Sequence, residues 1–204
     1  RQAWLMVALL WIAAFLNYLD RMILITMRSS IKEAIPMTDA QFGLLSTVFL
    51  VAYGMLSPFG GFFADRYNRS RIIVFSLFGW SAATWLTSHA STINEVLFYR
   101  GLLGVCQAAY FPAAAALLMD YHRDKTRSLA NGIHLSGVMV GSGLGGLGGW
   151  IADQAHWTFV FQLFGVIGIL YAGVLFFLLK DRSREIAAPG EPVDAVPVLR
   201  LGQT

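Results

Sequence analysis

The chain has 204 residues, of which 56% are hydrophobic and 13% are charged. Because ordinary soluble domains carry about 25% charged residues, this composition excludes a typical soluble domain and indicates a membrane protein. The formal net charge of +3 is weak evidence for nucleic-acid binding, and we expect no nucleic-acid partner.

Six uncharged runs are each long enough to cross about 30 Å of hydrocarbon. They are residues 3–19, 42–64, 72–94, 101–119, 128–152 and 157–179. The first run is interpreted as a span rather than a secretory signal, because Asn17, Asp20 and Arg21 stand where a small-residue cleavage site would be expected. The sequence therefore predicts an all-α membrane protein with six transmembrane helices in a lipid bilayer.

The basic residues are unevenly distributed between the loops. If the N-terminus is cytoplasmic, the outside loops hold only Arg28 and Lys32. The inside segments then hold Arg1, Arg66, Arg69, Arg71, Arg123, Lys125, Arg127, Lys180, Arg182, Arg184 and Arg200. By the positive-inside rule, this distribution predicts a multi-pass protein of the cell membrane with both termini in the cytoplasm.

Residues 60–71, GGFFADRYNRSR, place a cluster of charges between the second and third runs. The arginines serve topology, but an aspartate contributes little to orientation, so Asp65 needs another explanation. An acid at a helix end can pair with nearby arginines or meet the N-terminus of a neighbouring helix. The loop is therefore a candidate charge latch between groups of helices, and plain anchoring at the cytoplasmic surface is the alternative.

Ionisable side chains also occur inside the predicted spans, where they usually face a cavity or a partner. From the helical rise, Asp20 lies about 10 Å below the outer end of the first span, and Arg100 lies about 9 Å below the same surface. We expect Asp20 to carry a coupled proton and Arg100 to bind an anion. The alternative is that these groups only neutralise each other and join helices. The candidate substrate and proton-coupling residues are Asn17, Asp20, Arg21, Arg100 and Gln107.

Glycines form a row in the fifth run, at Gly137, Gly141, Gly145 and Gly149. Small residues on one stripe let two helices approach closely in lipid, so close helix packing is the preferred interpretation, ahead of direct substrate contact. Residues 1–180 are expected to form one six-helix bundle. Residues 181–204 contain three prolines and mixed charge, which predicts a cytoplasmic linker or tail.

Enzyme chemistry has little support in the sequence. Cys106 is the one cysteine and lies in the middle of a span, and the four histidines lack metal-ligand spacing. Neither a nucleophile arrangement nor a phosphate-binding loop is recognisable. We therefore predict a protein that is not an enzyme and that has no metal site and no cofactor.

Residues 61–69, GFFADRYNR, resemble the signature loop of the major facilitator superfamily, G-x-x-x-D-R-x-G-R-[RK], in the same position between the second and third spans. Asn68 replaces the usual glycine, and asparagine tolerates a left-handed backbone better than most residues do. The resemblance implies a secondary transporter whose two six-helix halves rock about a central site. It assigns a gating role to Gly61, Asp65, Arg66 and Arg69, and it implies a second half in the same or a separate chain.

Two further stretches, LNYLDR and YRGLLGVCQAAYFP, resemble Spinster-type lipid transporters and the related organic anion:cation symporters. Those families usually have R-G-x-x-G-x-x-E-A in the fourth span, and Gln107 stands here in place of the glutamate. The fifth span also lacks the proline of the antiporter Gly-Pro pair, so the direction of transport stays open.

The leading hypothesis is a secondary active transporter that moves an organic anion or an anionic amphipathic lipid by alternating access. Transport is either coupled to protons, with Asp20 as the proton site, or facilitative. A non-transporting membrane scaffold or receptor is the alternative. It would explain the spans and the basic loops but not the buried charges. A lipid-modifying membrane enzyme is a third reading, which lacks a recognisable nucleophile or metal cluster.

Overall fold

The computed structural model describes residues 2–122 and 124–181. Within these residues the chain forms nine α-helices, a short 3-10 helix and no strand. In chain order they are α1 (Gln2–Thr26), α2 (Arg28–Ala34), α3 (Asp39–Arg66), α4 (Arg69–Thr87), α5 (Ile93–Gln107), α6 (Tyr110–Tyr121), the 3-10 helix (Asp124–Thr126), α7 (Arg127–Gly143), α8 (Gly146–Gln154) and α9 (Trp157–Leu178). Of the expected linker or tail, only Asp181 is among the described residues, and residues 182–204 lie outside them.

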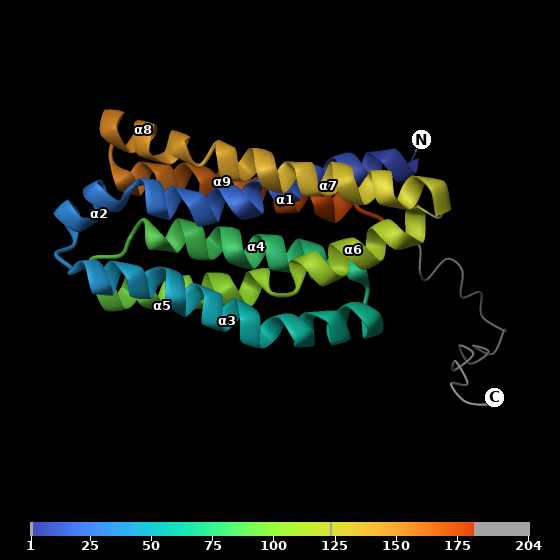
Figure 1. Ribbon diagram of the computed structural model, residues 1–204, viewed down its shortest axis with the longest axis horizontal. Coiled ribbons are helices and arrows are strands. Elements are labelled where there is room, and N and C mark those ends of the chain that lie inside the picture. The colour runs from blue at the N-terminus through green and yellow to red at the C-terminus, as the bar shows by residue number, and fades with distance from the viewer. Residues whose placement is uncertain (1, 123, 182–204) are drawn as a thin grey trace, which may run out of the picture.

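The helices form six rods, because α5 continues into α6 and α7 continues into α8 (Figure 1). Among the described residues, five rods are long and apolar enough to cross a membrane: Gln2–Thr26, Asp39–Arg66, Ile93–Tyr121, Arg127–Gln154 and Trp157–Leu178. The sixth is α4, which corresponds to the third predicted run. It is less apolar because it begins with two arginines and carries serine and threonine side chains that are buried against its neighbours.

The rods run along the long axis of the molecule in alternating directions (Figure 1). The start of α1, the turn between α3 and α4, the segment between α6 and α7 and the end of α9 therefore meet at one end of the bundle. This end, called the basic end below, holds Arg66, Arg69, Arg71, Lys125, Arg127 and Lys180. Short helix α2 lies at the opposite end, where Thr38 and Thr92 form capping boxes at the starts of α3 and α5.

Close pairs of helices build the bundle: α1 with α7, α4 with α9 and α3 with α5. The glycine row explains the first pair. A Cβ atom at Gly137 would come within 2.6 Å of the carbonyl oxygen of Trp11, and one at Gly141 would collide with the carbonyl oxygen of Phe15. These glycines therefore allow the backbones of α1 and α7 to touch, which supports the packing interpretation.

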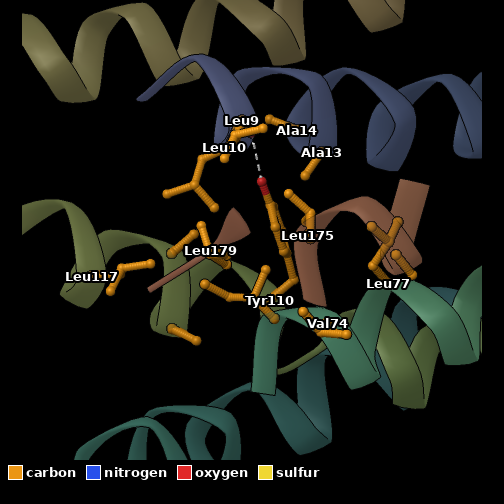
Figure 2. Close-up of a cluster of buried hydrophobic side chains, with 14 of the residues drawn as sticks. Leu9, Leu10, Ala13, Ala14, Val74, Leu77, Tyr110, Leu117, Leu175 and Leu179 are labelled. Carbon is orange, nitrogen blue, oxygen red and sulfur yellow. Dashed lines mark hydrogen bonds between the residues drawn. The ribbon is translucent and has the colours of Figure 1, made fainter. Parts of the chain in front are cut away.

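The core lies where α1, α4, α6 and α9 meet (Figure 2). Tyr110 is fully buried there, and its hydroxyl donates a hydrogen bond of 2.9 Å to the carbonyl oxygen of Leu10. Trp80 packs edge-on against the same ring with 5.3 Å between ring centres. Since Tyr110 is the first residue of α6, this packing fixes the position at which the fourth rod changes from α5 to α6.

Candidate functional site

Two opposite charges are buried in the half of the bundle away from the basic end. Asp20 on α1 is 4% exposed and Arg100 on α5 is 3% exposed. Asp20 lies six residues before the end of α1 and Arg100 seven residues after the start of α5, which places both about 10 Å from that end of the bundle. The predicted common depth is therefore present in the structure.

The two charges interact electrostatically, but they form no ion pair within 4.0 Å in the described part of the chain. The carboxylate of Asp20 instead accepts a hydrogen bond of 3.3 Å from the hydroxyl of Thr84 on α4. The guanidinium of Arg100 lies over the ring of Phe161 on α9, with 5.8 Å from its central carbon to the ring centre. Thr84 and Phe161 were not among the residues predicted from the sequence.

Arg21 is held in a cage of three aromatic rings. Its central guanidinium carbon lies 4.7 Å from the ring centre of Tyr18, 4.8 Å from that of Phe49 and 4.6 Å from that of Tyr53. Its Nε donates a hydrogen bond of 2.9 Å to Oε1 of Gln107. Cation–π contacts of this kind stabilise a desolvated guanidinium. Arg21 therefore links α1, α3 and α5, and it has no carboxylate partner within the described residues.

Gln107 joins Arg21 to the backbone of Asn17. It is fully buried and donates a 3.4 Å hydrogen bond from Nε2 to the backbone oxygen of Asn17, while accepting from Arg21. The side-chain amide of Asn17 is also fully buried and has no hydrogen-bond partner among the described residues. Hydrogen bonds thus join Arg21, Gln107 and the backbone of Asn17, whereas Asp20 interacts with Arg100. The five predicted residues together are called the interior polar cluster: Asn17, Asp20, Arg21, Arg100 and Gln107.

The cluster contains unused hydrogen-bond donors. Nε and Nη2 of Arg100 and Nη2 of Arg21 are buried without an acceptor in the part of the chain that the structure describes. Burying donors of a charged group without acceptors is costly. Anionic oxygens that reached these nitrogens would satisfy them.

A cavity of about 210 Å³ lies beside these donors. It is lined by Arg21 and Arg100 and by side chains that are mainly apolar: Tyr18, Met22, Leu24, Ile25, Leu45, Ser46, Phe49 and Leu50. Sites for drug-sized ligands usually enclose about 300–1,000 Å³. This cavity therefore suits a head group or part of an apolar chain, and a larger ligand needs further walls.

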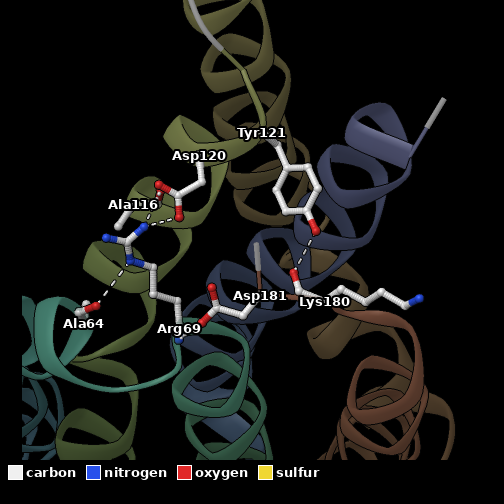
Figure 3. A network of polar contacts seen from close by, with 7 residues as sticks. All are labelled: Ala64, Arg69, Ala116, Asp120, Tyr121, Lys180 and Asp181. Carbon is white, nitrogen blue, oxygen red and sulfur yellow. Dashed lines mark hydrogen bonds and ion pairs between the residues drawn. The ribbon is translucent and has the colours of Figure 1, made fainter. Parts of the chain in front are cut away.

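A second polar network lies at the basic end and centres on Arg69, the first residue of α4 (Figure 3). Its guanidinium forms an ion pair with Asp120 on α6 and donates from Nε to the carbonyl oxygen of Ala64, at 3.2 Å. Its backbone N–H donates to the carboxylate of Asp181, at 2.6 Å. Asp181 thus meets the N-terminus of α4, which is the arrangement that the sequence suggested for Asp65.

Asp65 itself is exposed on the last turn of α3 and forms no ion pair with any described residue. The neighbouring Arg66 lies over the ring of Phe62, 4.3 Å from its centre, and a Cβ atom at Gly61 would meet open space. The structure therefore brings Arg69 into the network and leaves Gly61, Asp65 and Arg66 on the surface.

Asn68 differs from the expectation of a left-handed backbone. Its φ is −62°, and its side-chain oxygen accepts a hydrogen bond of 2.9 Å from the backbone N–H of Arg71. Asparagine is a preferred N-cap residue, so it begins α4 here by capping. Asp120 and Asp181, which complete the network, were missed in the sequence, although both are acids placed at the basic ends of predicted spans, as Asp65 is.

Comparison with known proteins gives consistent matches. Residues 10–202 match the sequence profile of the Major Facilitator Superfamily. The chain is 32% identical over 182 residues to protein spinster homolog 1 of Xenopus tropicalis, covering 87% of this chain and 35% of that protein. It is 29% identical over 184 residues to the sphingosine-1-phosphate transporter SPNS2 of Mus musculus, covering 87% of this chain and 33% of that protein.

Two solved structures share the fold. Both are crystal structures of a bacterial homolog to the human lysosomal transporter Spinster, in inward-facing conformations. The unoccupied form gives a TM-score of 0.82 at 24% identity, covering 100% of this chain and 48% of that chain. The occupied form gives a TM-score of 0.76 at 26% identity, covering 86% of this chain and 44% of that chain. The chain thus spans about a third of the curated relatives and about half of these solved chains.

Proposed function

Because the chain belongs to the Major Facilitator Superfamily, we propose that it is the membrane-embedded N-terminal half of a secondary active transporter that works by alternating access. The proposed cargo is an organic anion or an anionic amphipathic lipid. The relatives are transporters, so the prediction that the chain is not an enzyme is confirmed. A second six-helix half, in the same or a separate chain, completes the proposed transporter.

The observation that carries this proposal is a cavity lined by two arginines whose guanidinium groups have unused donors in the described part of the chain. Arg100 and Arg21 line the cavity and have donors without acceptors among the described residues. Guanidinium groups bind the oxygens of carboxylates and phosphates through paired hydrogen bonds. The apolar walls suit a hydrocarbon chain, so one ligand with an anionic head and an apolar tail fits both parts. The second half would supply the remaining walls.

Asp20 supports coupling of this step to protons. Its carboxylate is buried, and Arg100 is the basic side chain with which it interacts electrostatically. An anion that binds Arg100 competes for this positive charge, and protonation of Asp20 removes the competing negative charge. Anion binding and protonation of Asp20 therefore favour each other. Gln107 cannot titrate, which leaves Asp20 as the carboxylate of the interior polar cluster.

We propose that the basic end lies on the cytoplasmic side of the cell membrane, in keeping with the positive-inside rule. There, Gly61, Asp65 and Arg66 form an exposed surface at the end of α3, beside the network of Arg69. We assign this surface to contact with the second half when the basic end is closed. Residues 182–204, outside the described part of the chain, are the proposed linker or tail.

Uptake into proteoliposomes separates the proposal from the alternative of a scaffold or receptor. The complete transporter, that is, this chain together with its second half, is reconstituted, and entry of radiolabelled dodecyl phosphate is followed with and without a pH gradient. A transporter takes up the anion above protein-free vesicles, and coupling raises the accumulated amount when the gradient is present. Binding of the anion without uptake would favour the receptor.

A further inference from the structure

His134 on α7 is buried and has no role in the mechanism above. It is 2% exposed, and neither ring nitrogen has a hydrogen bond of normal geometry among the described residues. The carbonyl oxygen of Leu10 lies close enough to stabilise an imidazole N–H, but it already accepts from the hydroxyl of Tyr110. A buried imidazole whose neighbouring acceptor among the described residues is a carbonyl oxygen shared with Tyr110 is weakly partnered, and this calls for a physical explanation.

The surroundings of His134 are apolar and aromatic. It shares the face of α7 that carries Gly137 and Gly141 and packs on α1. From α6, the rings of Tyr110 and Phe111 lie 6.0 Å and 5.9 Å from the imidazole centre. No carboxylate or basic side chain of the described residues interacts with the imidazole.

The phenols of Tyr110 and Tyr171 are the titratable groups packed nearest to His134, while His122 and the charged Arg127 lie further toward the basic end. Tyr110 on α6 is bonded to Leu10, and Tyr171 on α9 donates to the carbonyl oxygen of Leu9 at 2.7 Å and interacts electrostatically with Tyr110. Both phenols are neutral donors here. A proton added to His134 would therefore create an imidazolium ion with no counter-ion, which is stable only if water reaches it.

The depth of His134 separates it from the interior polar cluster. It lies beside Leu10 of α1, and Asp20 is ten residues further along the same helix. At the helical rise, the two groups are about 15 Å apart along the bundle axis. His134 is therefore too far from Asp20 to share a proton with it directly, and it lies nearer the basic end.

A cavity of about 230 Å³ opens between α6 and α7 in this half of the bundle. It is lined by Ala115, Leu118, Met119, Arg127, Ser128 and Asn131. Asn131 lies three residues before His134 on α7, and Ala115 lies four residues after Phe111 on α6, so the cavity reaches to about one helical turn from the imidazole. Helix α7 packs mainly against α1 and only lightly against α6. The seam between α6 and α7 is therefore the side on which water can most easily approach.

We infer that His134 is a second proton-binding site, reached from the basic end through the cavity between α6 and α7, and that its protonation favours opening of this end. The neutral imidazole fits the dry packing seen here, whereas the imidazolium needs a hydrated seam. The link to opening rests on the proposed alternating access, but proton binding by His134 does not depend on the nature of the cargo.

The test uses the full-length protein in lipid nanodiscs, with Asp20→Asn to remove the other proton site. Solid-state NMR of ¹⁵N-labelled histidine, assigned by the signal lost in His134→Phe, reports protonation between about pH 7.5 and about pH 5.5. Opening is measured as the rate at which Asn131→Cys reacts with a membrane-impermeant thiol reagent. The reference is the rate for Tyr67→Cys, on the surface of the same end. Both variants also carry Cys106→Ala, which removes the native thiol.

We expect His134 to become protonated at the lower pH and the relative labelling rate to rise severalfold. His134→Phe and His134→Asn should abolish this rise, while His89→Phe, at an exposed histidine of the opposite end, should retain it. An imidazole that stays neutral at both pH values, or an equal rise in both His134 variants, overturns the inference. Anion uptake by wild-type protein is measured in parallel, so that a failure of the transport proposal is recognised separately.

Discussion

The two arginines of the interior polar cluster lie at a similar depth but in different environments, since Arg100 is buried and Arg21 is half-buried. Arg21 is fixed by Gln107 and by three aromatic rings, which leaves Nη2 as its free donor. Arg100 has two free donor nitrogens and a looser contact with Phe161. This difference suggests that Arg21 chiefly holds α1, α3 and α5 together, whereas Arg100 is available to bind a ligand.

Replacement of Arg100 by alanine should weaken anion binding, and it should also lower stability by about 3–5 kcal/mol, because it leaves the buried Asp20 without its basic neighbour. A hydrogen bond to a charged group contributes about 1.5–3 kcal/mol, so the loss of Arg100 should lower affinity for dodecyl phosphate by roughly tenfold to a hundredfold. Calorimetric titration of the full-length protein in nanodiscs measures this change. Lys32→Ala, at a surface ion pair with Asp39, is the control and should bind normally. Equal affinity of Arg100→Ala and the wild type would show that Arg100 does not contact the anion.

The glycines of α7 determine how closely this helix packs against α1. A Cβ atom at Gly141 would collide with the backbone of α1, whereas one at Gly143 would meet open space. Gly141→Ala should therefore lower the unfolding temperature, because overpacking of a tight interface costs about 1–3 kcal/mol. Gly143→Ala is a matched control on the same helix. The packing interpretation fails if the two variants unfold at the same temperature in a thermal shift assay.

At the basic end, we expect one acid, Asp120, to affect stability and another, Asp65, to affect gating. Asp120 pairs with Arg69 within this half, while Asp65 is exposed and unpaired among the described residues. We expect Asp65→Ala to slow exchange between inward-facing and outward-facing forms without changing anion affinity, since it lies far from the interior polar cluster. Single-molecule fluorescence between the two halves measures the exchange rate.

Asp120→Asn is the matched comparison for this prediction. It removes a partly buried ion pair that joins α4 to α6, so it should lower thermal stability, which Asp65→Ala should leave unchanged. If Asp65→Ala instead changes anion affinity tenfold at an unaltered exchange rate, the gating role of Asp65 is wrong.

At the scale of the whole molecule, the sequence was sufficient for the architecture, whereas the roles of the interior polar cluster stay a prediction. Uncharged runs and basic loops predict six rods with shared ends, and the cost of burying charge selects Asp20 and Arg100. The partners could not be predicted, because Thr84, Phe49 and Tyr53 are ordinary span residues until tertiary packing places them beside a charge. For the same reason, the sequence could not show that Asp181, rather than Asp65, meets the N-terminus of α4.

The orientation of the whole bundle in the membrane can also be tested. Thr38 lies at the end that holds α2, and Asn68 lies at the basic end. Cysteines introduced at these two positions of the full-length protein should react with an impermeant reagent from opposite sides of the membrane, with Asn68→Cys accessible from the cytoplasm. Reaction of both from the same side is incompatible with the fold, and a reversed pair would reverse the orientation.

Accumulation of an anion against its gradient by Asp20→Asn is the most direct test of the coupling between proton and anion. Asparagine keeps the shape of the side chain and an acceptor for Thr84 but cannot bind the proton. In proteoliposomes with an imposed pH gradient, the wild-type protein should concentrate dodecyl phosphate. Asp20→Asn should exchange it only downhill, at a measurable rate. Accumulation by Asp20→Asn equal to that of the wild type would contradict the assignment of Asp20 as the coupling residue.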